Sequence, residues 1–169
     1  DYIIADPVVI PIGYEKYYSE KILRLPNTYM PTDNTRAIST HLISRSEMGL
    51  PESGFVFCCF NNNYKISPRE FDIWMRVLLQ VEESVLWLRS SNTLSETNLR
   101  SQAATRGVAP SRLIFAARVP MDEHLARHKM ADLFVDTFNY NAHTTASEAL
   151  WAGLPVVTKA GEGFSARAA

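Results

Sequence analysis

Residues 55–68 read FVFCCFNNNYKISP, and this stretch decides the fold. Its first six residues are apolar without a break, which is typical of a β-strand that is covered on both faces. Three asparagines and a lysine follow as a polar loop. Ser67 and Pro68 then stand where a helix N-cap and the first helical residue belong. The stretch therefore predicts a buried strand, a loop and a helix in direct succession.

Residues 68–79 carry apolar side chains at helical spacing. They form one stripe that we expect to face the core: Phe71, Trp74, Met75, Leu78 and Leu79. The three tryptophans fall on apolar stripes and are predicted to be core residues: Trp74, Trp87 and Trp151. Cys58 and Cys59 point to opposite faces of a buried strand, which favours packing over catalysis.

The alternation of strand and helix continues along the chain. Further strands are predicted at 84–88, 112–116, 133–136 and 155–158, and helices at 95–106, 121–130 and 144–151. Because each helical crossover returns the chain in the same direction, the five strands make a parallel sheet. The predicted fold class is α/β, a Rossmann-like parallel sheet with flanking helices over residues 53–169. Such sheets bind ligands at the carboxyl ends of their strands.

Residues 1–52 do not share this rhythm and are rich in proline. They predict a short strand, an extended connector and a helix near residues 36–48 that packs on the domain edge. The chain opens without methionine, and residues 164–169 read as a helix that is cut off in its second turn. We therefore expect the chain to be a piece of a longer protein.

The composition narrows the class of protein. The 169 residues are 46% hydrophobic and 21% charged, as in a soluble globular domain, and the formal net charge of -1 argues against a nonspecific nucleic-acid binder. No apolar run has the length of a membrane helix. The two adjacent cysteines have no metal-site or disulfide spacing, which suits a reducing, cytoplasmic compartment.

The usual phosphate-binding motifs are absent, because no glycines make G-x-G-x-x-G and there is no G-x-x-x-x-G-K-[ST]. The best candidate for a phosphate-binding site without these motifs is the loop 139–145, which ends in His143, Thr144 and Thr145 at a predicted helix start. Free backbone N–H groups and the helix dipole favour an anion there. Glu148, further along that helix, could accept hydrogen bonds from ribose hydroxyls. The alternative is that Thr144 merely caps its own helix.

Two other loops carry candidate residues. Lys65 follows the first strand of the sheet and could neutralise a leaving diphosphate, although a lone lysine is more often a solvated surface group. His124 and His128 stand four apart on a predicted helix, but no third metal ligand has suitable spacing. The better interpretation is that His124 and Arg127 stack on a base or contact a phosphate. The alternative is that both are ordinary polar residues of the surface.

Three segments together resemble a known family: FNNNYKISP (60–68), VPMDEHLARHKMADLFVDTFNYNAHTT (119–145) and EALWAGLPVVT (148–158). They are similar to the catalytic region of protein O-GlcNAc transferases and their SPINDLY-like relatives. The opening DYIIAD and residues 18–33 also resemble that family's linker into its second lobe. The resemblance implies the C-terminal half of a glycosyltransferase-B architecture. Residues 1–52 would then be a linker and edge segment from a preceding catalytic lobe, and 53–169 a nucleotide-sugar-binding lobe truncated at its C-terminus.

The resemblance also implies roles for single residues. Lys65 matches the lysine that stabilises the UDP diphosphate, and Asn62 matches another nucleotide-contacting position. His124 matches a histidine that packs on uracil, with Val119 offering backbone groups and Arg127 close by. The diphosphate cradle matches His143, Thr144 and Thr145. Two positions depart from the pattern, since Met121 replaces a lysine and Glu148 replaces an aspartate that contacts ribose.

The chemistry that this implies is attack by a protein Ser or Thr hydroxyl on the anomeric carbon of a UDP-sugar, most simply UDP-GlcNAc, with inversion. No metal or other cofactor is expected. The general base and tetratricopeptide repeats would lie outside this chain, so the fragment alone is expected to be inactive. The expected partners are the donor, a protein acceptor and the missing lobe, without nucleic acid or membrane. The alternatives are a nucleotide-sugar epimerase and a non-catalytic interaction module on the same fold.

Overall fold

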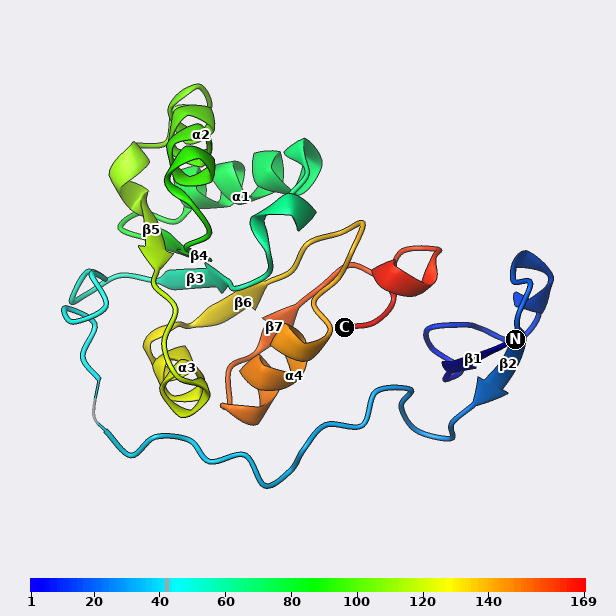
Figure 1. The fold of residues 1–169 in the computed structure, drawn as a ribbon. Coiled ribbons are helices and arrows are strands. Elements are labelled where there is room, and N and C mark those ends of the chain that lie inside the picture. The colour runs from blue at the N-terminus through cyan, green and yellow to red at the C-terminus, as the bar shows by residue number, and fades with distance from the viewer. Residues whose placement is uncertain (42) are drawn as a thin grey trace.

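The computed structural model describes residues 1–41 and 43–169 (Figure 1). The strands are β1 (Tyr2–Ala5), β2 (Lys21–Arg24), β3 (Val56–Cys59), β4 (Val85–Arg89), β5 (Leu113–Ala116), β6 (Leu133–Val135) and β7 (Val156–Val157). The helices are α1 (Pro68–Gln80), α2 (Thr93–Ala104), α3 (Met121–Arg127) and α4 (Thr144–Trp151). None of the helices in the described residues has the length and apolar character that a membrane span requires.

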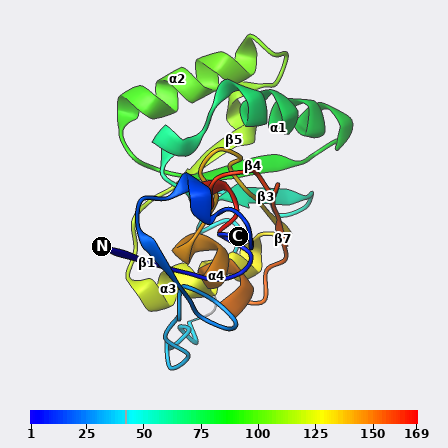
Figure 2. The ribbon, with the colours of Figure 1, turned by 90° about the vertical axis from the view of Figure 1, so that its right-hand side faces the viewer.

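Five of the strands form one parallel sheet in the order β5-β4-β3-β6-β7. Helices α1 and α2 cover one face of this sheet, and α3 and α4 cover the other (Figures 1 and 2). The Rossmann-like sheet with flanking helices is therefore confirmed. From β3 the chain first continues to β4 and β5 on one side of β3, and it then returns to β6 and β7 on the other side. The strand order therefore reverses between β3 and β6. A crevice opens at the carboxyl ends of strands where the order reverses in this way.

Helix α1 begins at the predicted residue, and its N-terminal cap shows why. Ser67 and Glu70 form a capping box, in which the Ser67 N–H donates to the Glu70 carboxylate at 2.6 Å. Four residues of the predicted stripe are buried: Phe71, Trp74, Met75 and Leu78. Leu79 is 51% exposed, so its assignment to the core was wrong. At 100° per residue it lies at the edge of the stripe rather than within it.

The core confirms the packing role of both cysteines. Cys58 and Cys59 are fully buried in β3, and burial raises the pKa of both thiols, that of Cys59 to about 12. They are therefore protonated and unreactive at neutral pH. Trp87 is also fully buried, whereas Trp151 is 41% exposed, contrary to the prediction. Trp151 lies at the end of α4, where its indole Nε1 donates to the Arg36 carbonyl at 3.2 Å.

The N-terminal third differs most from its prediction. β1 and β2 form a separate parallel pair, of which only one strand was predicted. Asp6 closes the turn after β1 by accepting from the N–H groups of Val8, Val9 and Tyr29. Burial works to raise the pKa of Asp6, but these three hydrogen bonds outweigh burial and lower it. The carboxylate is thus held ionised at the base of the turn.

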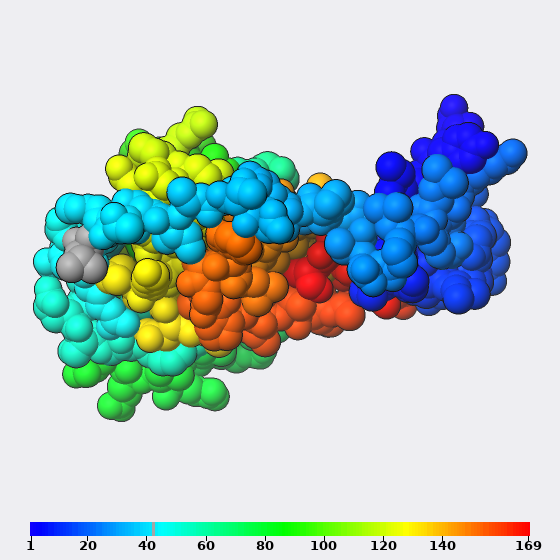
Figure 3. Space-filling view, turned by 90° about the horizontal axis from the view of Figure 1, so that it is seen from below, coloured from blue at the N-terminus to red at the C-terminus, as the bar shows by residue number. Residues whose placement is uncertain are grey.

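The helix predicted near residues 36–48 is not formed by the described residues of that range, which exclude residue 42. Residues 36–40 instead run as an extended strap along α3 and α4 (Figure 3), and residues 45–49 form a turn. The backbone of the strap bonds to those helices, because the Ser39 N–H donates to the Asp122 carbonyl and the Arg36 carbonyl accepts from Trp151. Residues 164–169 likewise hold a single 3-10 turn, Phe164–Ala166, in place of the expected helix.

Candidate functional site

A pocket of about 280 Å³ opens where the strand order reverses, at the carboxyl ends of β3 and β6. Five residues singled out from the sequence line it: Asn62, Lys65, His143, Thr144 and Thr145. Four others that the sequence analysis did not select complete the wall: Phe60, Asn61, Arg89 and Tyr140. The two loops that were proposed separately as anion sites thus make one pocket.

A buried hydrogen-bond network holds these two loops together. The Asn61 amide donates to Asp136 Oδ1 at 2.9 Å and to Thr137 Oγ1 at 2.8 Å, and its Oδ1 accepts from Thr145 Oγ1. Asp136 also accepts from the N–H groups of Thr137 and Ala142 and from the Thr158 hydroxyl. Asn61 and Asp136 are 2% and 1% exposed. Because the two residues at the centre of this network are buried, the two loops keep a fixed spacing.

Lys65 is held in place before any ligand arrives. Its Nζ donates to the Asn141 carbonyl at 3.1 Å and lies 3.8 Å from the centre of the Tyr140 ring. Partial burial lowers the pKa of Lys65, while Asp136 acts in the opposite direction. A cation with little water around it attracts an anion more strongly than a solvated lysine does. The alternative that Lys65 is a free surface group is therefore wrong.

The start of α4 supplies the second attractive feature of the pocket. His143 is the N-cap, and no side chain among the described residues caps the helix, which contradicts the alternative that Thr144 serves only as a cap. The first N–H groups of α4 and the positive end of its dipole therefore stay available beside Lys65. Thr144 and Thr145 line the same wall.

The His143 ring contacts two tyrosines. It stacks on Tyr140 with centroids 5.0 Å apart, and its Nδ1 lies 3.1 Å from the Tyr29 hydroxyl. Burial lowers the pKa of His143, aided by the nearby charge of Lys65 and opposed by the Ser165 carbonyl. The neutral imidazole is thus favoured. Tyr29 reaches it from the N-terminal segment, 114 positions away in the sequence.

A second cluster lies beside the pocket and contains the other predicted residues. His124 Nε2 and Arg36 Nη1 each lie 3.4 Å from the Glu148 carboxylate. Arg127 Nη2 lies 2.5 Å from His124 Nδ1. Since a guanidinium can only donate, His124 accepts at Nδ1 and carries its proton on Nε2, toward Glu148. Phe60 joins this cluster to the pocket, because its ring centre lies 5.3 Å from that of His124.

Three of the predicted residues in this region are buried or half-buried. Arg127 is 4% exposed, packs over the Phe60 ring and donates to the Ala117 carbonyl. Burial lowers the pKa of Arg127 to about 10. Glu148 is also 4% exposed. Val119 lies half-buried in the loop between β5 and α3, outside the residues that line the pocket.

Some further residues of the pocket and of the second cluster could have been found from the sequence and others could not. Arg89 directly follows the strand predicted at 84–88, and Tyr140 lies inside the loop that was selected, so the carboxyl-end rule covers both. Tyr29 and Arg36 have no local signal, because their partners lie more than 110 positions away.

His128 is fully buried and does not form a metal-binding pair with His124. Its Nδ1 donates to the His124 carbonyl at 2.8 Å, and the two rings meet edge to face. Within the described residues, no group of three or more His, Cys, Asp or Glu side chains is arranged to hold a metal ion. His128 is therefore a core residue of the 3-10 turn His128–Met130 that follows α3.

The buried His128 predicts how stability depends on pH. Burial, aided by His124, lowers the pKa of His128 from 6.5 to about 4, so the unfolded chain takes up a proton that the folded chain resists. Stability should fall between pH 6.5 and 4, by about 3 kcal/mol from this residue. Urea unfolding at pH 7 and 4.5 should show a smaller pH effect in His128→Gln. His41→Gln, at an exposed histidine, should keep the full effect.

Comparisons with known proteins show that this chain is similar to glycosyltransferases. The family model described as glycosyl transferase family 41 matches residues 31–169. The probable UDP-N-acetylglucosamine–peptide N-acetylglucosaminyltransferase SEC of Arabidopsis thaliana is 37% identical over all of this chain and 18% of its own length. The Caenorhabditis elegans UDP-N-acetylglucosamine–peptide N-acetylglucosaminyltransferase is 39% identical over 78% of this chain and 11% of its own.

The fold has a solved counterpart as well. A mutant of the Thermobaculum terrenum O-GlcNAc transferase superposes with a TM-score of 0.83 at 30% identity, over 99% of this chain and 32% of that one. The pneumococcal O-GlcNAc transferase GtfA, solved with UDP and GlcNAc, shares the fold with a TM-score of 0.57 at 15% identity. This chain therefore spans less than a fifth of the two curated relatives and about a third of the first solved one.

Proposed function

Because this chain belongs to glycosyl transferase family 41, we propose that it is the donor-binding lobe of an inverting protein O-glycosyltransferase. The donor is UDP-GlcNAc and the acceptor a Ser or Thr hydroxyl of a protein. One observation carries the proposal: Lys65 and the uncapped start of α4 line the same pocket where the strand order reverses. Relatives named for the same donor and for peptide acceptors support the choice of substrates.

In this proposal the pocket binds the diphosphate and stabilises it as a leaving group. The acceptor oxygen forms a bond to the anomeric carbon while the bond from that carbon to the diphosphate oxygen breaks. The electron pair leaves with UDP, and attack from the opposite side inverts the configuration. Lys65 and the N–H groups at the start of α4 stabilise the charge that grows on UDP. A general base outside this chain takes the hydroxyl proton.

We assign the nucleoside to the second cluster. His124 packs on the uracil, with the Val119 backbone and Arg127 beside it, and Glu148 accepts from the ribose hydroxyls. Arg127 acts through His124 in this arrangement, because its contact with Nδ1 fixes which ring nitrogen carries the proton. Asn62 completes the wall beside the diphosphate. Lys65 and the helix start would neutralise the phosphates, so a metal ion is not needed for this role.

Titration of UDP into the chain tests this proposal directly. We expect measurable heat of binding that EDTA leaves unchanged, and an affinity for UMP at least about tenfold lower, because UMP lacks the second phosphate that meets Lys65. Equal binding of UMP and UDP would contradict the diphosphate assignment. Absence of any heat at millimolar UDP would contradict the proposed function. In the full-length protein, conversion of free UDP-sugar without a protein acceptor would indicate an epimerase instead.

A further inference from the structure

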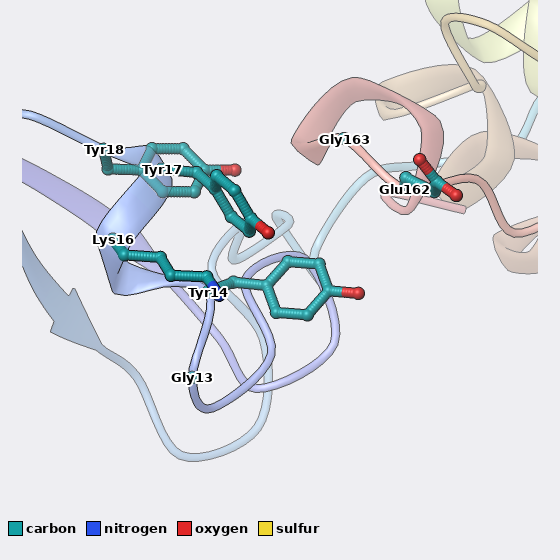
Figure 4. A pocket seen from close by; sticks show the side chains of 7 residues that line it. All are labelled: Gly13, Tyr14, Lys16, Tyr17, Tyr18, Glu162 and Gly163. Carbon is teal, nitrogen blue, oxygen red and sulfur yellow. The ribbon is translucent and has the colours of Figure 1, made fainter.

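A larger cavity, of about 590 Å³, lies between the N-terminal segment and the loop before Phe164. We call it the tyrosine pocket, and Figure 4 shows the side chains that line it. Its lining consists of Gly13, Tyr14, Lys16, Tyr17, Tyr18, Glu162 and Gly163. One wall belongs to the loop that follows β1, which is the carboxyl end of a parallel strand pair. Ligands bind parallel sheets at that end.

The two walls of the tyrosine pocket are held at a fixed spacing. Arg167 donates through Nε to the Val8 carbonyl at 2.7 Å and through Nη1 to the Gly161 carbonyl at 2.9 Å. On the first wall, Arg24 holds the loop by its ion pair with Glu15. The cavity is therefore built by contacts on both sides and does not depend on a single mobile loop.

The walls have the chemistry of a peptide-binding surface. Tyr14 and Tyr17 meet edge to face, with centroids 5.6 Å apart, and are 38% and 69% exposed. Both project into the gap, with Glu162 across from them (Figure 4). Rigid tyrosine rings offer large contact area and hydroxyl groups at a low cost in conformational entropy. Lys16 and Glu162 add one charge of each sign, and neither belongs to an ion pair among the described residues.

A short chain of contacts connects the tyrosine pocket with the pocket lined by Lys65 and the start of α4, which we call the diphosphate pocket. Phe164 follows Gly163 directly, and its ring lies 4.9 Å from that of Tyr29. The Tyr29 hydroxyl in turn contacts His143, which lines the diphosphate pocket. Phe164 and Tyr29 thus link the two cavities by direct contacts. A chain segment in the tyrosine pocket would run past these rings toward the reacting sugar.

We propose that the tyrosine pocket is an acceptor subsite, in which Tyr14 and Tyr17 grip the polypeptide that carries the reacting Ser or Thr hydroxyl. This inference rests on the proposed function. A peptide fits better than a second phosphorylated ligand, because Lys16 is the one cation in the lining and Glu162 opposes it. The subsite acts on acceptor affinity and makes no contact with the donor.

The test is a pair of titrations of initial rate in the full-length protein. One varies a synthetic Ser/Thr-rich peptide at saturating UDP-GlcNAc, and the other varies UDP-GlcNAc at fixed peptide. In the double variant Tyr14→Ala, Tyr17→Ala we expect the KM for peptide to rise at least about fivefold, which is about 1 kcal/mol of lost binding. The KM for UDP-GlcNAc should stay within twofold.

Tyr2→Ala is the matched control, because Tyr2 is 64% exposed on β1 and does not line the cavity. Both of its KM values should match those of the unaltered protein. An unchanged KM for peptide in the double variant overturns the subsite, and so does an equal rise in both KM values. Failure of the proposed function would show separately, as loss of UDP binding by the unaltered chain.

Discussion

Replacing Lys65 by Met should lower the rate of sugar transfer in the full-length protein about 100-fold or more. The substitution keeps a long side chain against Tyr140 but removes the charge that faces the leaving diphosphate. Losing one preorganised group that stabilises charge in the transition state costs about two to three orders of magnitude in rate. Steady-state kinetics at saturating UDP-GlcNAc measures the loss in kcat, and calorimetry with UDP measures the accompanying loss of affinity.

Lys129→Met is the control for this result, because it removes the same charge from an exposed side chain. It should leave both kcat and UDP affinity unchanged, which separates a local effect of Lys65 from a change in overall charge. Lys65→Arg keeps the charge and should retain part of the rate. A Lys65→Met enzyme with normal turnover would contradict the leaving-group role.

Replacing Asp136 by Ala should destabilise the fold by about 3 kcal/mol or more. Asp136 is 1% exposed and accepts from Asn61, Thr158 and two backbone N–H groups. The substitution removes this acceptor from the buried Asn61 amide and from the buried N–H groups of Thr137 and Ala142, and each unsatisfied buried donor costs about 1–3 kcal/mol. Urea unfolding followed by circular dichroism should show a midpoint lower by about 1–2 M.

Asp72→Ala tests whether this cost comes from burial. Asp72 forms an ion pair with Arg106 at 2.6 Å, but its side chain is 53% exposed. Exposed pairs contribute about 1 kcal/mol or less, so the midpoint should shift little. A comparable loss in both variants would contradict the view that the buried network, rather than carboxylate pairing in general, holds the two loops together.

Much of the fold follows from local patterns. The run at 55–60 predicted β3, and the Ser67–Glu70 capping box began α1 at the expected residue. Errors arose where tertiary contacts competed with local preference. The segment near 36–48 was expected to be a helix, but its backbone binds α3 and α4 instead. The residues next to Trp151 in the sequence are apolar, yet its indole donates to the backbone of this same segment, at Arg36.

The candidate site divides in the same way. Lys65, His143, Thr144 and Thr145 were selected because their loops follow strands, and the pocket brings all four together. Tyr29 and Arg36 were not selected, because nothing in their own segments indicates what they contact. The buried state of Arg127 and Glu148 also depends on neighbours from other elements. Their roles in binding the nucleotide stay predictions.

From residue 55 to residue 158, the sequence by itself determined the succession of strands and helices, the parallel sheet and the loops at its carboxyl edge. Periodicity, caps and turn residues act between neighbours a few positions apart, so they can be seen in a single chain. Only the tertiary structure decided that Asp136 joins the two loops, that Arg36 reaches Glu148, and that Tyr29 holds His143. These contacts join residues 75 to 114 positions apart. They exist because the strand order brings distant segments together, which no local pattern records.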